Sequence, residues 1–408
     1  MTAATLVVVT AAVFAWGALS ARLERSALTA PIVFLVVGVL LSPAMPSAAP
    51  PPAESFRLLT EVTLVWVLFS DAARVGLREL RSDAGIYGRL LGLALPSTVV
   101  LGWLVAAAIL PGVDAWLALL VGAALAPTDA ALGAPVMNDP RVPKRISGIL
   151  NVESGLNDGI VTPVVLIALA GVAAEGDEAT GLSHAALELL LGALAGGLVG
   201  TAGGGLLRVA RRRAWVDEEF AGPAVLALAL LAYAVALACG GNGFVAAFVG
   251  GLAFGSAAGR ASPRAVFYVE QTGALAGLLV WTLFGAVAVP VVVDTATWQL
   301  VLYAVLSVTA LRMVPVFVAL AGSGLGRRAA LFVGWFGPRG LASVVFALLA
   351  VEDLGHRADP AVAVIVLTVL LSVVVHGATA APFAARFGPG LLPASVTPSA
   401  GGDAGAGS

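Results

Sequence analysis

Two groups of polar side chains lie inside apolar segments, and their oxygen atoms could bind a small cation. The first group lies in the run Ala126-Pro127-Thr128-Asp129, and the second in the run Glu153-Ser154-Gly155-Leu156-Asn157-Asp158. An ionised side chain at bilayer depth costs about 3 kcal/mol even on lenient scales. These residues therefore predict a site that handles a charge inside the membrane.

Helical spacing brings the polar side chains of the second run together. Ser154 and Asp158 are four residues apart and share one face of a helix, and Glu153 and Asn157 share the next face. Carboxylate, hydroxyl and amide oxygens make the surroundings that Na⁺, Li⁺ and other hard cations prefer. If Asp129 joins Asp158 from a neighbouring helix, a cation or protons can neutralise both carboxylates, but not both at once. That mutual exclusion is what an exchange reaction requires.

Glu153 adds a third carboxylate at the same depth and needs a different explanation. A buried carboxylate is either protonated or paired, and a buried guanidinium also needs a partner. Arg312, in an apolar run of the second half, is the partner that we expect. We interpret this pair as a structural brace; the alternative is that both side chains line a cytoplasmic vestibule separately.

The composition indicates a membrane protein. The 408 residues are 60% hydrophobic and 11% charged, with a mean hydropathy of +1.00, whereas soluble domains are about 25% charged. This excludes a soluble enzyme and leaves no room for a sizeable soluble domain. A net charge of −2 provides no basic surface for nucleic acid. The single cysteine, Cys239, lies in an apolar run and is expected to be a small core residue.

Apolar segments long enough to cross a bilayer follow one another along almost the whole chain. We expect thirteen transmembrane helices, at 3–20, 27–42, 57–73, 88–110, 115–137, 146–173, 182–207, 221–238, 241–259, 270–292, 297–320, 329–351 and 360–385. The alternative is a miscount by one, for example if 221–259 forms a single long helix. Arg22 follows the first segment and no basic residue precedes it, which favours a transmembrane helix over a signal peptide.

The distribution of basic residues predicts the orientation. If the N-terminus is outside, eighteen of the 22 Lys and Arg residues fall on the cytoplasmic side. A bias of Lys and Arg toward the cytoplasm is the main determinant of orientation. An odd number of spans preserves this alternation and places the C-terminus in the cytoplasm. We expect a multi-pass protein of the cell (inner) membrane.

Two predicted spans are interrupted in the middle, each by a proline close to an ionisable residue. The fifth span breaks at Pro127 and Asp129, and the twelfth breaks at Pro338 and Arg339. Two inverted six-helix repeats around a linker helix would place these breaks at equivalent positions, with the broken helices crossed at mid-depth. Free helix ends carry partial charges, which Asp129 and Arg339 could compensate. The alternative is a pair of ordinary proline kinks.

Several other features are expected to lie outside the site. Glu61 and Asp71 could each reach a membrane interface, and His376 is expected to be a hydrogen-bonded core histidine. Residues 43–53 are proline-rich and predict a stiff external connector. Residues 387–408 predict a disordered cytoplasmic tail.

These motifs, in this order and spacing, resemble those of the monovalent cation:proton antiporters, in the NhaP / sodium–hydrogen exchanger branch. Thr128-Asp129 and the run 153–158 resemble the paired-helix motif of that family, and Leu311-Arg312 and the run 334–340 resemble its two arginine motifs. The resemblance extends over about 3–386. It implies an all-α polytopic membrane protein with an NhaA-like antiporter fold that forms a homodimer.

The resemblance also implies a division into a scaffold and a mobile core. Helices 1–3 (residues 1–87), together with linker helix 7 and helices 8–10 (174–296), would form the dimerisation scaffold. Helices 4–6 (88–173) and 11–13 (297–386) would form a core that shifts to give alternating access.

By the same resemblance, the carboxylates of Asp158 and Asp129 would bind the cation. The Ser154 hydroxyl and the main-chain carbonyl of Thr128 would complete the site. Three further residues would support it: Glu153 through water, Asn157 by positioning the site, and Arg312 by pairing with Glu153.

The resemblance favours electroneutral exchange of one cation for one proton. Electrogenic relatives carry two adjacent aspartates and a membrane lysine, whereas this chain has Asn157 at the first of these positions. Its only lysine, Lys144, lies in a predicted cytoplasmic loop. One departure is that Ala130-Ala131 follows Asp129, where the family usually has Pro-Val.

We therefore expect a secondary antiporter that exchanges Na⁺, or else Li⁺ or K⁺, for H⁺. No cofactor is expected, and the expected partners are the ions, the lipid bilayer and a second copy of the chain. One rival is a K⁺-efflux antiporter with the same fold. Another is a cation channel or a non-transporting sensor, although a channel needs a continuous polar path and the acidic residues cluster only at mid-depth.

Overall fold

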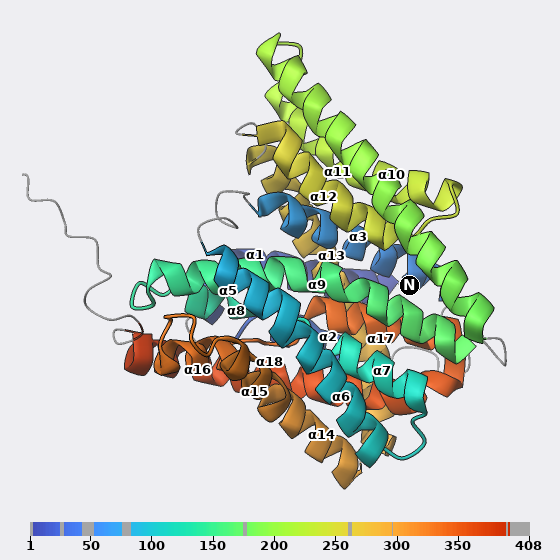
Figure 1. The fold of residues 1–408 in the computed structure, drawn as a ribbon, viewed down its shortest axis with the longest axis vertical. Helices are drawn as coiled ribbons and strands as arrows, with labels where there is room; N and C mark the ends of the chain where they lie inside the picture. The colour runs from blue at the N-terminus through green and yellow to red at the C-terminus, as the bar shows by residue number, and fades with distance from the viewer. Residues whose placement is uncertain are drawn as a thin grey trace, which may run out of the picture.

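The computed structural model describes residues 3–24, 28–42, 53–75, 83–173, 178–259, 263–295, 297–388 and Leu391, which form helices joined by short turns (Figure 1). The helices are α1 Ala3–Glu24, α2 Ala30–Leu41, α3 Ala53–Arg74, α5 Ala84–Arg89, α6 Leu95–Ile109, α7 Ala115–Ala124, α8 Ala130–Met137, α9 Lys144–Ala173, α10 Glu178–Arg212, α11 Glu218–Ala238, α12 Gly243–Ala258, α13 Pro263–Thr295, α14 Trp298–Val308, α15 Ala310–Ala319, α16 Arg327–Trp335, α17 Leu341–Leu354 and α18 Asp359–Phe387. A π-helical segment, Leu90–Ala94, joins α5 to α6, and a 3₁₀ turn, Gly355–Ala358, precedes α18.

The chain is an all-helical, polytopic membrane protein. Eight helical stretches within the described ranges are long and apolar enough to cross a bilayer, and α2, α7 and α12 are shorter apolar helices. Each expected apolar segment coincides with one helix, or with two short helices in a row. The segment 221–259 is not a single helix: α11 ends at Ala238, and the Asn242 side chain accepts the N–H of Phe244 to begin α12.

At the ends of helices, the structure differs from the sequence-based expectation near Thr309 and at Cys239. The segment 297–320 breaks at Thr309, whose backbone leaves helical geometry (φ −117°, ψ −95°), so α14 and α15 are separate helices. Cys239 is exposed and is not a core residue, because it follows the last turn of α11 where the chain turns toward α12. The expected connector 43–53 and the expected tail 387–408 lie almost wholly outside the described residues.

Small residues allow α10 and α12 to pack closely. Added Cβ atoms at Gly192, Gly196 and Gly200 would overlap backbone atoms of Asn242, the N-cap of α12, and of Ala246 and Gly250 within α12. The three glycines recur every four residues and so form one face of α10. Without a hydrophobic driving force between helices in lipid, close backbone approach through small residues is a main source of association.

Three helices, α3, α9 and α13, connect α10, α11 and α12 to the rest of the molecule. In Figure 1, α10, α11 and α12 lie together at one end, over α3 and α13. Contacts of α3 extend to α9 and α17, and α13 also contacts α17 and α18. The polar motif of α9 therefore packs against α3, and α17 packs against both α3 and α13.

Candidate functional site

The polar run on α9 lies at the centre of a long helix and faces the protein interior. Glu153, Ser154, Asn157 and Asp158 are 2%, 6%, 0% and 7% exposed. The helical spacing expected from the sequence holds because α9 continues without a break from Lys144 to Ala173. Burial on this scale means that each polar atom needs a partner, a proton or an ion.

The breaks between α7 and α8 and between α16 and α17 lie against each other. The N–H of Asp129 donates to the Pro338 carbonyl at 2.8 Å. The hydroxyl of Ser343, on α17, donates to the carbonyl of Ala124, the last residue of α7, at 2.6 Å. Unwound backbone is tolerated at this depth only where such partners are available. The two prolines are therefore parts of one joint structure and not separate kinks.

Asp129 caps the N-termini of both half-helices that leave this crossing. One carboxylate oxygen accepts the N–H of Ala131 at 2.7 Å and of Leu132 at 3.1 Å, at the start of α8. The other oxygen accepts the N–H of Leu341 at 2.9 Å, at the start of α17. Helix N-termini are positively polarised, so a carboxylate is stabilised there. A Cβ at residue 340 would overlap this carboxylate, which explains why Gly340 precedes α17.

Arg339 performs the complementary role for carbonyl groups at three helix ends. Its guanidinium is completely buried and donates to the following carbonyls: Ala126 at 3.3 Å, Pro127 at 3.4 Å, Gly337 at 3.2 Å and Ser307 at 3.1 Å. Ala126 and Pro127 follow α7, Gly337 follows α16, and Ser307 lies in the last turn of α14. The unexpected break at Thr309 thus frees carbonyls that Arg339 uses.

Three side chains connect the first break to α9. The Asn157 amide donates to the Thr128 hydroxyl at 2.7 Å, and that hydroxyl lies 2.9 Å from the Ser154 hydroxyl. The amide oxygen of Asn157 is buried and has no hydrogen-bond partner among the described residues. Asn157 therefore holds the Thr128 hydroxyl, and through it is linked to Ser154.

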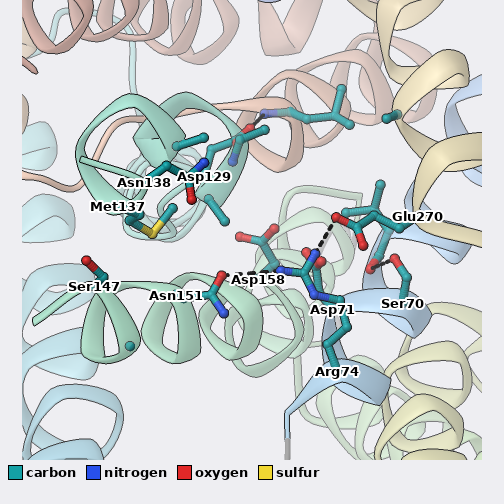
Figure 2. A pocket seen from close by; sticks show the side chains of 17 residues that line it. Ser70, Asp71, Arg74, Asp129, Met137, Asn138, Ser147, Asn151, Asp158 and Glu270 are labelled. Carbon is teal, nitrogen blue, oxygen red and sulfur yellow. Dashed lines mark hydrogen bonds and ion pairs between the residues drawn. The ribbon is translucent and has the colours of Figure 1, made fainter. Parts of the chain in front are cut away.

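Asp158 lies at a cavity of about 600 Å³ (Figure 2). Asp129 and Asp71 line the same cavity, and its wall includes the exposed residues Ala131 and Asn138, so it opens to the surface. One carboxylate oxygen of Asp158 is buried without a hydrogen-bond partner among the described residues. An ionised carboxylate in that state is unstable until a proton or a cation reaches it.

Glu153 and Arg312 form the ion pair that the sequence suggested. The two guanidinium nitrogens lie 3.0 and 3.1 Å from the two carboxylate oxygens, and both side chains are 3% exposed. The pair joins α9 to α15, and Arg312 also reaches the Val333 carbonyl of α16 at 3.5 Å. It does not line the cavity, so the vestibule alternative is wrong.

A buried histidine supports the second break. His376 is 3% exposed, and its Nε2 lies 2.9 Å from the Trp335 carbonyl, to which it must donate. Its Nδ1 lies 3.0 Å from the Ser372 hydroxyl, which in turn accepts the N–H of Arg339 at 2.7 Å. The expected hydrogen-bonded core histidine is confirmed, since both ring nitrogens have partners and the ring is buried.

The sequence-based reasoning missed one wall of the cavity. Asp71, expected at an interface, lines the cavity together with Arg74, Glu270 and Asn151. The helix α3 continues to Arg74, so Asp71 lies one turn inside its end and faces α9. The spacing of Asp71 and Arg74 was the available signal, because residues three apart share a helix face.

Glu61 lies at the opposite end of α3. It accepts from Arg57 at 2.7 Å and from the Tyr233 hydroxyl at 2.9 Å. Arg57 also pairs with Glu352 of α17 at 3.1 Å. Rising 1.5 Å per residue, α3 separates Arg57 from Arg74 by about 26 Å. An ion-pair network therefore joins α3 to α17 at the end of the molecule away from the cavity.

The described residues contain no group of three or more His, Cys, Asp or Glu with the arrangement of a metal site. The site expected from the sequence uses two carboxylates, a hydroxyl and a carbonyl: those of Asp129, Asp158, Ser154 and Thr128. The structure places all four residues around one helix crossing. Such a weakly charged set suits a monovalent ion that must also leave.

Comparison with known proteins gives consistent matches. A family profile described as "Sodium/hydrogen exchanger, transmembrane" matches residues 8–386. The K(+)/H(+) antiporter NhaP of Alkalimonas amylolytica is 29% identical over 339 residues, which is 80% of this chain and 57% of that protein. An uncharacterized Na(+)/H(+) exchanger of Mycobacterium bovis is 33% identical over 192 residues, 46% of this chain and 33% of that protein. The chain thus spans 33% to 57% of the length of these relatives.

A solved structure shares the fold. The sodium proton antiporter MjNhaP1 from Methanocaldococcus jannaschii is similar with a TM-score of 0.75, over 94% of this chain and 98% of that one. The two sequences are 20% identical over this region. The likeness therefore concerns the fold and not the ion.

Proposed function

Because the chain belongs to the sodium/hydrogen exchanger family, we propose that it is a secondary antiporter that exchanges a monovalent cation for H⁺. The observation that carries this proposal is the carboxylate of Asp158. It is buried, has an oxygen without a partner, and lies at the wall of an open cavity that Asp129 shares. Na⁺ is the first candidate cation, with Li⁺ and K⁺ as alternatives.

Competition for Asp158 couples the two ions. A proton and a cation both neutralise the carboxylate, so binding of one displaces the other. Asp129 contributes charge but keeps its oxygens on two helix N-termini, where it acts mainly as a fixed cap. Ser154 and Thr128 supply oxygens beside the same crossing, and Asn157 keeps them in place.

The proposed transport is electroneutral. Arg339 and Arg312 are permanently charged at accessible pH, so neither can release a proton in exchange for the cation. Asn157 occupies the position of a second aspartate in electrogenic relatives and is bonded as an amide donor. One exchangeable negative charge is then neutralised by one cation or one proton.

The membrane arrangement is also part of the proposal. We place thirteen spans across the cell membrane, with the N-terminus outside, the C-terminus in the cytoplasm, and two inverted repeats crossing at Asp129 and Arg339. The scaffold would comprise 1–87 and 174–296, and the moving core 88–173 and 297–386, in a homodimer. The contact of both breaks with each other and the basic-residue asymmetry support this assignment.

The test uses everted membrane vesicles with a preformed pH gradient. Addition of Na⁺ should collapse the gradient, and Asp158→Asn should abolish the response. Undiminished exchange in Asp158→Asn would remove Asp158 from the site. A rate that changes with membrane voltage would contradict electroneutral exchange.

A second candidate is K⁺/H⁺ exchange at the same site. It is favoured by one relative, which is described as a K(+)/H(+) antiporter and matches 80% of this chain. Replacing NaCl by KCl or LiCl in the vesicle assay separates the ions. A cation current without proton movement would instead indicate a channel.

A further inference from the structure

An ion pair forms part of the cavity wall beside the proposed ion site. Arg74 Nη1 lies 2.6 Å from a carboxylate oxygen of Glu270, and each side chain is 34% exposed. The pair joins α3 to α13, and Figure 2 shows the guanidinium on the side of the cavity that holds Asp71 and Asp158. Neither residue belongs to the polar motifs.

Arg74 is the only basic side chain among the described residues that line this cavity. The lining includes four acidic side chains: Asp71, Asp129, Asp158 and Glu270. A guanidinium stays protonated at any pH that the protein meets. Arg74 is therefore a permanent cation attached to the wall of a cavity whose proposed purpose is to bind a cation.

Two partners hold this guanidinium in a fixed position on the cavity wall. Its second nitrogen donates to the Asn151 side chain at 3.3 Å. Asn151 and Asp158 are seven residues apart on α9, so they lie on the same side of the helix, about 10 Å apart along its axis. Glu270 and Asn151 thus occupy the guanidinium, and neither of these two partners is a residue of the proposed ion site.

Without Glu270, the nearest unpaired acids would attract Arg74. Asp71 lies three residues earlier on the same helix face, and Asp158 has an oxygen without a partner. The arginine side chain is long and flexible, and loss of its carboxylate partner would leave it beside two acids in a partly enclosed cavity. It would then compete with the transported cation from within the protein.

We propose that Arg74 and Glu270 are positioning residues that set cation affinity: Glu270 restrains a tethered cation that would otherwise occupy the carboxylates of the ion site. The inference rests on the proposed function. It assigns to the wall pair a role that neither residue would have in a purely structural ion pair. If the ion pair were purely structural, loss of Arg74 and loss of Glu270 would have the same effect on transport.

The experiment measures exchange in everted vesicles as a function of Na⁺ concentration. Glu270→Gln should raise the KM for Na⁺ by about fivefold or more, the factor that corresponds to an exposed charge pair of about 1 kcal/mol, with little change in kcat. Arg74→Gln should not raise the KM. The double variant should return to a KM near that of the wild type, since no tethered cation remains.

Two controls test specificity. Asp83→Asn breaks a matched pair, in which Arg145 lies 2.6 Å from Asp83, but neither residue lines the cavity; its KM should not change. Glu270→Asp keeps the negative charge and should keep the wild-type KM. Na⁺-dependent thermal stabilisation of the purified full chain gives an affinity that does not depend on how much protein each variant yields.

Three outcomes would overturn the inference. A double variant as impaired as Glu270→Gln would mean that the pair only supports the structure. An unchanged KM and affinity in Glu270→Gln would mean that Arg74 does not compete. If wild-type vesicles move no protons with Na⁺, Li⁺ or K⁺, the proposed function itself fails; active wild type with an unchanged Glu270→Gln contradicts this inference alone.

Discussion

The carboxylate of Asp129 accepts the N–H of Leu341 at 2.9 Å, so a side chain from one broken segment caps the helix that follows the other. Its second oxygen caps α8 at Ala131. The two half-helices begin 211 residues apart in the sequence, at Ala130 and Leu341, and share one cap. Any movement of α8 relative to α17 must break the Asp129–Leu341 hydrogen bond, unless the two helices move together. Asp129 is therefore a structural element as well as a proposed ligand.

Replacement of Asp129 should reduce stability more than replacement of Asp158. Asp129→Ala removes caps from two helices, and loss of each cap costs about 1 kcal/mol, so we expect about 2 kcal/mol in total. Asp158→Ala removes a side chain that has an unpartnered oxygen and caps no helix. Thermal melting of the purified variants measures the difference. Equal melting temperatures for the two variants would contradict the double-cap assignment.

Arg339 should be indispensable for folding. Arg339→Gln leaves several buried carbonyls without a charged donor, and we expect a loss of at least about 3 kcal/mol. Arg339→Lys should recover little, because an ammonium group cannot span carbonyls at the ends of three different helices. Arg328→Gln, an exposed arginine on α16, is the matched control. The yield of monodisperse protein and its melting temperature report the effect.

The Glu153–Arg312 pair should act as a unit. Each single replacement, Glu153→Gln or Arg312→Gln, leaves a buried charge unpaired and should cost about 3–5 kcal/mol. The apolar double replacement Glu153→Leu/Arg312→Met should be far less damaging, because it leaves no buried charge. Melting temperatures of the wild type, the two single variants and the double variant give the coupling free energy between Glu153 and Arg312.

The same series tests whether Glu153 belongs to the ion site. If the pair is only a brace, the folded double variant should keep the wild-type KM for the cation. A raised KM in a stable double variant would show that Glu153 also contributes to ion binding through water.

The network at the far end of α3 should help to keep that end closed. Arg57 pairs with Glu352 of α17, although Arg57 is half exposed. Exposed pairs contribute about 0.2–1 kcal/mol, so Arg57→Gln should raise the access of a thiol reagent from that end by a factor of about 1.4 to 5. Leu349 is 4% exposed and lines the small cavity next to this network. The labelling rate of Leu349→Cys in a Cys239→Ser background measures the access.

A matched variant separates this closure from general loosening. Arg141→Gln breaks an even shorter pair, in which Arg141 lies 2.6 Å from Asp139. This pair lies in the turn between α8 and α9, far along the chain from Leu349. It should leave the labelling rate unchanged. Faster labelling in Arg141→Gln as well would mean that Arg57 has no specific role in closing this end.

The sequence by itself determined the class of protein, the approximate helix boundaries and the residues of the proposed site. Hydropathy defines helices in lipid because an apolar segment has no other stable state there, and a charge inside such a segment is costly enough to indicate function. Pro127 and Pro338 located both breaks. Glu153 and Arg312 could be paired from the sequence because each is a charged residue inside an apolar segment and needs a partner.

Only the tertiary structure decided which polar groups meet and what each carboxylate does. Asp129 and Asp158 look alike in the sequence, yet one is held by three N–H groups and the other has an oxygen with no partner. Asp71, Arg74 and Glu270 carry no motif, and they reach the cavity because α3 and α13 pack against α9 and α17. Helix periodicity determines which residues share a face, whereas contacts between helices depend on packing that periodicity does not encode.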